Sequence, residues 1–162
     1  MRKADIIDSK IGTLNEVLHR VRQWRVTGKT VAFTNGVFDI LHRGHIFSLS
    51  QAAAEADFLV VGVNSDASTK RLKGDSRPLN DENSRALVLA SLLMVDMVVI
   101  FEEDTPLNVI TTLQPDILVK GGDYTFEQVV GAVEVTAAGG KVIINPIVEG
   151  FSTTGIIGKM RG

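Results

Sequence analysis

Residues 31–45, VAFTNGVFDILHRGH, pass from an apolar run through a polar turn into a segment of helical pattern. The apolar run, residues 31–34, predicts a buried β-strand, and apolar residues spaced by three and four predict a helix over residues 44–56. A strand that leads directly into a helix is the first half of a βαβ unit, in which the two strands are parallel. The stretch therefore predicts an α/β fold.

The rest of the chain repeats this alternation. Four more short apolar runs predict strands at residues 58–63, 98–100, 117–119 and 142–144. The segments between them predict helices at residues 83–93, 106–113 and 126–138. Continuously apolar strands are typical of a parallel sheet that is covered on both faces. We expect a Rossmann-like, doubly wound, five-stranded parallel sheet with helices on both faces.

Two segments fall outside the alternation. Residues 1–29 predict a helical N-terminal extension that packs on the sheet domain, with His19 and Trp24 in ordinary packing or surface roles. Residues 70–83 are polar and predict a surface loop. Asp104 is expected to cap the helix that follows it, and a left-handed stop is expected at residues 139–140, which are both glycine.

Composition limits the class of protein. The 162 residues are 44% hydrophobic and 22% charged, which predicts one globular domain over residues 1–162. A net charge of −2 argues against a nucleic-acid partner. The absence of cysteine excludes disulfides and thiolate sites and fits a reducing compartment. No apolar stretch approaches the ~18 residues that a membrane span requires, and we expect neither a signal peptide nor a membrane partner.

The first chemical signal lies in the turn after the first strand. The carboxyl ends of strands in an open α/β sheet are where ligands bind. Gly36 and Gly44 let the backbone approach an anion, and the helix that begins near Gly44 directs its free N–H groups at the same place. His42 and His45 are three residues apart and can face the same side. Two imidazoles there suit a phosphate group, although one histidine as a helix cap and the other as a surface residue is the structural alternative.

Several other chemistries lose support. The turn lacks the Gly-rich dinucleotide fingerprint, and no Gly-x-x-x-x-Gly-Lys-Ser/Thr phosphate loop occurs in the chain. Two histidines alone make a poor zinc site in a chain without cysteine. A nicotinamide oxidoreductase, a P-loop kinase and a structural zinc protein are therefore disfavoured.

The motifs together carry a resemblance to a known family. The turn HRGH at residues 42–45, preceded by NG and FD, is similar to the signature of the HxGH nucleotidyltransferase superfamily in its cytidylyltransferase-like branch. From about residue 25 onward the chain resembles the D-glycero-β-D-manno-heptose 1-phosphate adenylyltransferase family. The further motifs that carry this likeness are KRLKG (70–74), RP (77–78), EDTPL (103–107), VKGGDY (119–124) and EGFSTT (149–154). The resemblance implies the stand-alone form, without a sugar kinase.

The resemblance implies roles for individual residues. His42, His45 and Lys73 are expected to be catalytic, and Arg71, Arg77 and Arg85 are candidates for substrate phosphate, although either Arg77 or Arg85 can equally pair with a neighbouring carboxylate. The expected nucleotide-binding residues are Thr34, Asn35, Gly36, Phe38, Asp39, Gly44, Lys120, Gly121, Gly122, Asp123, Tyr124, Phe151, Ser152, Thr153 and Thr154. Outside this context, Gly121 to Asp123 is an ordinary turn and the hydroxyls at 152–154 an ordinary helix cap.

The implied reaction is adenylyl transfer from ATP to heptose 1-phosphate with loss of pyrophosphate. Mg²⁺ is expected as cofactor, held mainly by phosphates and water, with Asp39 as a candidate protein ligand. The resemblance also implies a cytoplasmic homo-oligomer, dimer or tetramer. Two alternatives stay open: a cytidylyl- or adenylyltransferase for another alcohol phosphate such as glycerol 3-phosphate, and a nucleotide-binding sensor without turnover.

Overall fold

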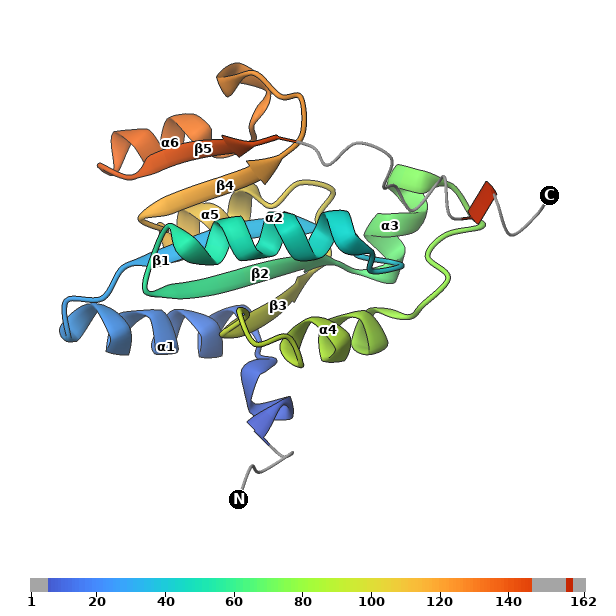
Figure 1. Ribbon diagram of the computed structural model, residues 1–162, viewed down its shortest axis with the longest axis horizontal. Coiled ribbons are helices and arrows are strands. Elements are labelled where there is room, and N and C mark those ends of the chain that lie inside the picture. Colours follow the sequence, from blue (N-terminus) through green and yellow to red (C-terminus); the bar gives the residue numbers. More distant parts are fainter. Residues whose placement is uncertain (1–5, 147–156, 159–162) are drawn as a thin grey trace.

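The five predicted strands form one parallel sheet in the order β3-β2-β1-β4-β5 (Figure 1). The computed structural model describes residues 6–146 and 157–158. The strands are β1 (Val31–Gly36), β2 (Phe58–Asn64), β3 (Met97–Phe101), β4 (Ile117–Gly121) and β5 (Lys141–Asn145). The strand order reverses direction between β1 and β4, and their carboxyl ends meet at the position where open α/β sheets hold ligands.

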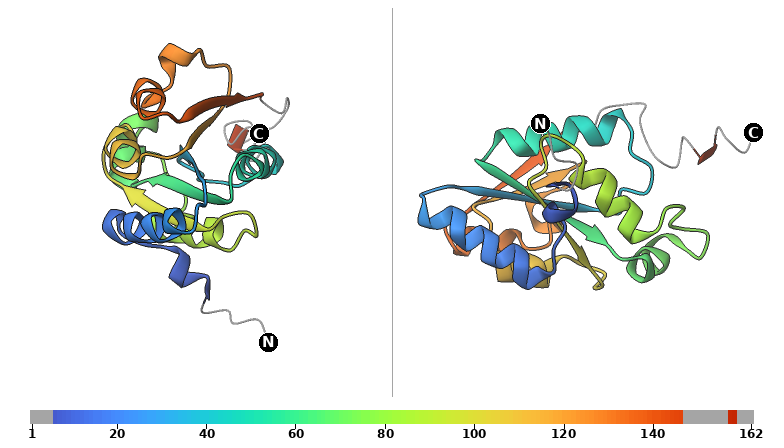
Figure 2. Two further views of the ribbon diagram at one scale, coloured as in Figure 1. Left: turned by 90° about the vertical axis from the view of Figure 1, so that its left-hand side faces the viewer. Right: turned by 90° about the horizontal axis from the view of Figure 1, so that it is seen from below.

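Helices cover both faces of the sheet, which confirms the predicted doubly wound architecture. They are α1 (Leu14–Val26), α2 (Arg43–Ala54), α3 (Asp66–Lys73), α4 (Glu82–Ala90), α5 (Leu107–Leu113) and α6 (Ala132–Ala137), with 3₁₀ turns η2 (Asp8–Lys10) and η3 (Phe126–Gln128). Figure 2 shows α1, α5 and α6 on one face and α2 and α4 on the other. No helix within the described residues is long and apolar enough to cross a membrane.

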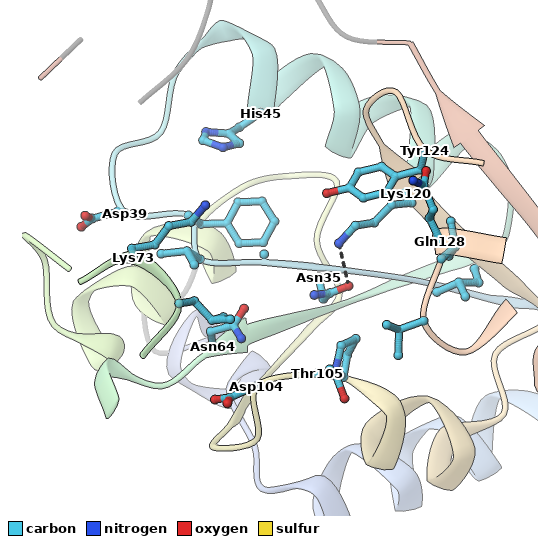
Figure 3. Close-up of a pocket in the computed structure, with 18 of the residues that line it drawn as sticks. Asn35, Asp39, His45, Asn64, Lys73, Asp104, Thr105, Lys120, Tyr124 and Gln128 are labelled. Carbon is cyan, nitrogen blue, oxygen red and sulfur yellow. Dashed lines mark hydrogen bonds between the residues drawn. The ribbon is translucent and has the colours of Figure 1, made fainter. Parts of the chain in front are cut away.

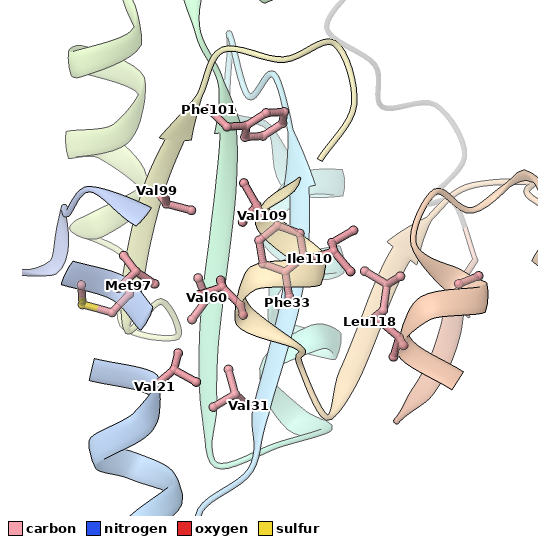
Figure 4. Close-up of a cluster of buried hydrophobic side chains, with 14 of the residues drawn as sticks. Val21, Val31, Phe33, Val60, Met97, Val99, Phe101, Val109, Ile110 and Leu118 are labelled. Atoms are coloured by element: carbon pink, nitrogen blue, oxygen red, sulfur yellow. The ribbon is translucent and has the colours of Figure 1, made fainter. Parts of the chain in front are cut away.

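Alternate residues of each strand enter different cores. Val31 and Phe33 of β1 point into the core beneath α1, α5 and α6 (Figure 4), whereas Ala32 between them points into the core beneath α2 and α4. This is the two-residue period of a strand with two buried faces. Phe33 is fully buried, so truncation to Ala is expected to cost about 3–5 kcal/mol.

The N-terminal segment packs on the sheet through α1. Thr13 and Glu16 form a reciprocal capping box at the start of the helix. Val17 and Val21 are fully buried in the core beneath α1, α5 and α6. Trp24 stacks on Phe58 with ring centroids 4.1 Å apart. These contacts explain why a segment outside the βα alternation is helical.

The structure corrects the predicted loop at residues 70–83. Its first four residues belong to α3, which begins after Ser65, whose side chain accepts a hydrogen bond from the Ser68 N–H. Gly74, with a φ of 91°, ends the helix. The helix was missed because α3 buries mainly small polar residues, Ser68 and Thr69, rather than an apolar stripe.

Two smaller predictions also change. The helix expected over residues 126–138 is η3 followed by α6, because Gly131 adopts a φ of 86° between them. A Cβ on Gly131 would lie 2.7 Å from Ile110, so a side chain is excluded there. Asp104 does not cap α5, whose N-cap is Pro106 without a side-chain hydrogen bond. The left-handed stop after α6 is present at Gly139, with a φ of 89°.

Candidate active site

The two histidines of the HRGH turn lie side by side at the start of α2. His42 is the N-cap residue, and its Nδ1 accepts a hydrogen bond of 3.1 Å from the Gly44 N–H. The His42 and His45 rings are stacked, with centroids 3.9 Å apart and an interplanar angle of 25°. One part of the structural alternative is confirmed, because His42 caps the helix through Nδ1. This cap does not use Nε2, which can still bind a ligand.

Both imidazoles are held in the neutral form. Burial lowers the pKa of His42 below its ordinary value. Burial, and after it positive charge on His42, lowers the pKa of His45 to about 4 against the opposing effect of the Ile40 carbonyl. Because His42 Nδ1 is an acceptor, its neutral ring carries the hydrogen on Nε2. The pair thus offers hydrogen-bond donation without prior protonation of His42.

A cavity of about 650 Å³ opens in front of the histidines (Figure 3). This volume lies within the range of sites for small molecules, roughly 300–1,000 Å³. Its walls come from the β1–α2 turn, the end of α3, the β3–α5 loop and β4, all at the carboxyl edge of the sheet. A smaller cavity of about 190 Å³ adjoins it beneath α2. Asn35, His45, Lys120 and Tyr124 line both.

Two lysines face the larger cavity from opposite sides. Lys73 belongs to the last turn of α3, and Lys120 to β4 (Figure 3). The Lys120 ammonium lies 3.4 Å from Asn35 Oδ1 and 5.5 Å from the centre of the Tyr124 ring. Burial lowers the pKa of Lys120, and the positive charge of Lys73 lowers it further. The cavity therefore carries positive charge that suits phosphate.

Asp39, predicted as a metal and nucleotide ligand, lines the larger cavity but is paired within the protein. Its side chain is 1% exposed and forms an ion pair of 2.6 Å with Arg77. Its carboxylate also accepts hydrogen bonds of 2.9 Å from the N–H groups of Leu79 and Asn80. Burial alone would raise the pKa of Asp39, but these N–H groups and the guanidinium lower it. All of its hydrogen-bonding capacity is used to hold the loop before α4.

All three arginine candidates form ion pairs within the protein, and two of them do not line the larger cavity. The Arg85 side chain is 1% exposed, pairs with Asp66 at 2.8 Å and donates to the carbonyls of Val37 and Asn80, so it does not reach a substrate phosphate. Arg71 points to Asp104, at 2.7 Å, and to the Glu102 carbonyl. Only Arg77 lines the cavity, with its Nε held by Asp39.

Other predicted residues surround the two cavities. Thr34, Asn35, Gly36 and Phe38 line one or both, and Phe38 adopts a positive φ of 51° in the turn. Gly121 approaches α2 so closely that a Cβ would lie 2.8 Å from Ser48 Oγ. Asp123 is exposed and lines neither of these two cavities. Phe151, Ser152, Thr153 and Thr154 lie outside the described residues.

Sequence reasoning missed several residues that line the larger cavity. They are Asn64 at the end of β2, Thr105 and Pro106 before α5, and Gln128 in η3. Asn64 and Thr105 each follow the apolar run of a predicted strand, and that position at the carboxyl edge was the available signal. Gln128 carried no signal, because its place depends on the break between η3 and α6. The described residues contain no group of three His, Cys, Asp or Glu arranged to hold a metal.

Comparison with known proteins places this fold among the nucleotidyltransferases. The model of the cytidylyltransferase-like family matches residues 33–159, and the chain belongs to that family. It is 55% identical to the bifunctional protein HldE of Rhodospirillum rubrum over 155 residues, which are 96% of this chain and 31% of that protein. HldE of Nitrobacter hamburgensis is 57% identical over 143 residues, 88% of this chain and 29% of that protein. The chain spans about a third of the length of these relatives.

Solved structures show the same relationship. A lipopolysaccharide core biosynthesis protein from Thermoplasma volcanium is 35% identical, with a TM-score of 0.61 over 75% of this chain and 98% of that chain. Pantoate-beta-alanine ligase from Francisella tularensis has the same TM-score, 0.61, at 18% identity, and covers 91% of this chain and 75% of that chain. The second likeness concerns the fold alone.

Proposed function

We propose that the chain transfers AMP from ATP to D-glycero-β-D-manno-heptose 1-phosphate and releases pyrophosphate. The observation that carries the proposal is the stacked pair of neutral imidazoles, His42 and His45, at the mouth of a cavity with two lysines. The identity to HldE over 96% of the chain and the likeness to a lipopolysaccharide core biosynthesis protein support this acceptor over other phosphates.

The reaction is a direct in-line displacement at the α-phosphorus of ATP. An oxygen of the acceptor phosphate forms a bond to that phosphorus, and the bond to the oxygen that bridges the α- and β-phosphorus breaks. The electron pair leaves with pyrophosphate. Because the attacking phosphate is already ionised near neutral pH, no protein base is required, and catalysis rests on position and charge.

His42 and His45 stabilise the transition state in this proposal. The Nε2–H of His42 donates to a non-bridging oxygen of the α-phosphate, where negative charge grows as the new bond forms. His45 stacks on His42 and faces the same cavity. Phosphate binding raises the pKa of both rings, since a nearby anion favours the imidazolium form. Lys73, on the opposite wall, neutralises charge on the substrate or on the leaving pyrophosphate.

The nucleotide lies across the carboxyl edge with its base side toward β4. Gly121 lines the smaller cavity there, and Tyr124 offers a ring for stacking, against which Gly122 lies so closely that a Cβ would come within 2.7 Å of the ring. Phe151 to Thr154, by family resemblance, complete the triphosphate site.

Mg²⁺ is the proposed cofactor, bound with ATP. Among the described residues, the carboxylates that line the larger cavity are Asp39 and Asp104, and each is paired with an arginine. The chain therefore leaves the ion to phosphate oxygens and water, which is the usual manner for Mg²⁺. When bound, the ion offsets negative charge on the triphosphate.

We also propose a homo-oligomer, dimer or tetramer, in the cytoplasm. Exposed apolar side chains on and after α4 support an interface between copies: Leu87 is 45% exposed, Val88 49% and Leu93 97%. The substrates, a nucleoside triphosphate and a sugar phosphate, support the compartment.

A pyrophosphate-release assay tests the function. ATP and CTP are each offered with D-glycero-β-D-manno-heptose 1-phosphate, glycerol 3-phosphate and mannose 1-phosphate, in the presence of Mg²⁺ and again with EDTA. We expect kcat/KM to be highest for ATP with the heptose phosphate and turnover to stop with EDTA. A preference for CTP or glycerol 3-phosphate would favour the alternative transferase, and tight ATP binding without turnover on any acceptor would favour the sensor.

A further inference from the structure

Lys120 is a half-buried cation without a counterion among the described residues. Its hydrogen bond to Asn35 Oδ1, at 3.4 Å, is long, and the acceptor is neutral. The two carboxylates of the same cavity do not compensate it, because Asp39 is paired with Arg77 and Asp104 with Arg71. A charge removed from water without a partner destabilises a fold, so its retention requires a reason.

The surroundings of Lys120 are otherwise positive or neutral. Lys73 on α3 repels it. Besides the two paired carboxylates, the other titratable groups that share its cavity are Arg77, which is held by Asp39, His42 and His45 at the start of α2, and Tyr124 after β4. Figure 3 shows the Lys73 and Lys120 side chains on facing sides of the same space, with His45 above Lys73 and Asn35 directly below the Lys120 ammonium. The arrangement lacks an anion, and a single dianionic group between the lysines would complete it.

The position of Lys120 separates two compartments. The smaller cavity, bounded by Ser48, Gly121 and Tyr124, lies on the side proposed for the nucleoside, and the larger contains Lys73 and Asn64. Lys120 lines both, and its ammonium is directed toward the larger. An anion held there would stand next to the α-phosphate that the histidines contact, which is where the attacking group must be.

We propose that Lys120, together with Lys73, binds the phosphate of the acceptor, a dianionic phosphomonoester, and that Asn35 orients Lys120 for it. The identification of this anion as the acceptor phosphate rests on the proposed function, whereas the existence of an anion site between the two lysines does not. Lys120, predicted from the sequence to bind the nucleotide, is thereby assigned to the binding of the acceptor instead. It also explains why Lys120 is half-buried without a counterion among the described residues: the phosphate of the second substrate neutralises it.

The first test is independent of turnover. The protein is saturated with Mg²⁺ and α,β-methylene-ATP, which occupies the nucleotide site, and its melting temperature is measured in inorganic phosphate and in chloride of equal ionic strength. We expect phosphate to raise the Tm of the wild type and of Lys141→Met, an exposed lysine at the opposite edge of the sheet, but not of Lys120→Met. An equal rise in Lys120→Met would overturn the proposal.

The second test separates the two substrates. Lys120→Met is expected to raise the KM for heptose 1-phosphate at least about tenfold, the scale of one lost charge-assisted hydrogen bond, and to leave the Kd of Mg-ATP within about threefold. Weaker Mg-ATP binding with an unchanged acceptor KM, or equal loss of both, would refute the assignment.

Failure of the proposed function would look different. A wild type that does not adenylylate the heptose phosphate, yet shows the phosphate-dependent Tm rise that Lys120→Met abolishes, would retain the anion site and reject that acceptor. The variant itself is expected to fold, because methionine keeps most of the length of the side chain and removes a half-buried charge that has no counterion among the described residues.

Discussion

Two groups of polar side chains share the carboxyl edge of the sheet and differ in where their hydrogen bonds go. In the closed network, formed by Asp39, Asp66, Arg77, Asn80 and Arg85, the charges are paired within the protein. In the open cluster, formed by His42, His45, Lys73 and Lys120, the side chains face a cavity, and no ion pair within the described residues joins them. The side chains of the closed network hold the loops in place, whereas those of the open cluster are available to bind a ligand.

This difference implies that the two groups respond to mutation in opposite ways. Changes in the closed network are expected to reduce the free energy of unfolding, whereas changes in the open cluster are expected to reduce turnover and leave the fold intact. A residue that behaved like the other group would break the distinction.

The largest effect is expected at Arg85. Arg85→Met leaves the Asp66 carboxylate and the carbonyls of Val37 and Asn80 without their donor, which is expected to lower the free energy of unfolding by about 3 kcal/mol. Urea denaturation measures the loss, with Arg22→Met, an exposed arginine on α1, as the control. A loss no greater than that of the control would show that the network is not structural.

His45→Ala is expected to have the next largest effect, on kcat. Removal of one group that stabilises the transition state typically lowers turnover by about two orders of magnitude or more. The melting temperature is expected to stay near that of the wild type, because the pair is not part of the closed network. His19→Ala, an exposed histidine on α1, serves as control. Near-normal turnover in folded His45→Ala protein would remove the basis for the mechanism.

The pH dependence of stability sharpens the comparison further. The pKa of His45 is lowered from 6.5 to about 4 in the folded state, so the unfolded chain binds the proton more readily between these values. This contribution to stability is complete above the unfolded pKa and is lost as the pH falls toward the folded one. With allowance for solvent screening, the wild type is expected to lose about 1 kcal/mol through this ring between about pH 7.5 and pH 5.

Urea denaturation at the two pH values measures this term by comparison with His45→Gln. The variant is expected to lose less stability on acidification than the wild type. Parallel losses in both proteins would mean that His45 titrates normally.

The smallest effect is expected at Arg71, which is paired but exposed. The Arg71 and Asp104 side chains are 47% and 51% exposed, and such pairs contribute about 0–1 kcal/mol. Arg71→Met is expected to change neither the unfolding free energy by more than about 0.5 kcal/mol nor the KM of either substrate. A large rise in the acceptor KM would return Arg71 to the set of phosphate-binding residues.

Most of the fold could be predicted from the sequence. Strands such as 58–63 are continuously apolar because both faces of the sheet are covered, and that signal is local. The exceptions have local causes of another kind: α3 buries small polar residues, and Gly131 interrupts a helical pattern through its positive φ. Hydrophobic periodicity detects neither a helix that buries small polar residues nor a break caused by a positive φ.

The site was predictable in place but not in the role of each charge. The stacking of His42 and His45 follows from their three-residue spacing at a helix start, which the sequence displays. The hydrogen-bond partners of Asp39 and Arg85 could not be predicted in this way, because they lie about 40 residues away in the chain. Asp39 accepts from Leu79 and Asn80, and Arg85 donates to Val37. Only tertiary structure tells a paired charge from one that faces the cavity.

The stereochemical course at the α-phosphorus tests the central claim most directly, namely that the open cluster promotes direct transfer of the adenylyl group. The wild-type protein is given one diastereomer of ATP with sulfur on the α-phosphorus, together with heptose 1-phosphate and Mg²⁺, and the configuration of the sugar nucleotide is determined. A single displacement predicts inversion. Retention would require an enzyme-bound adenylyl intermediate and would contradict a mechanism in which His42 and His45 only stabilise charge.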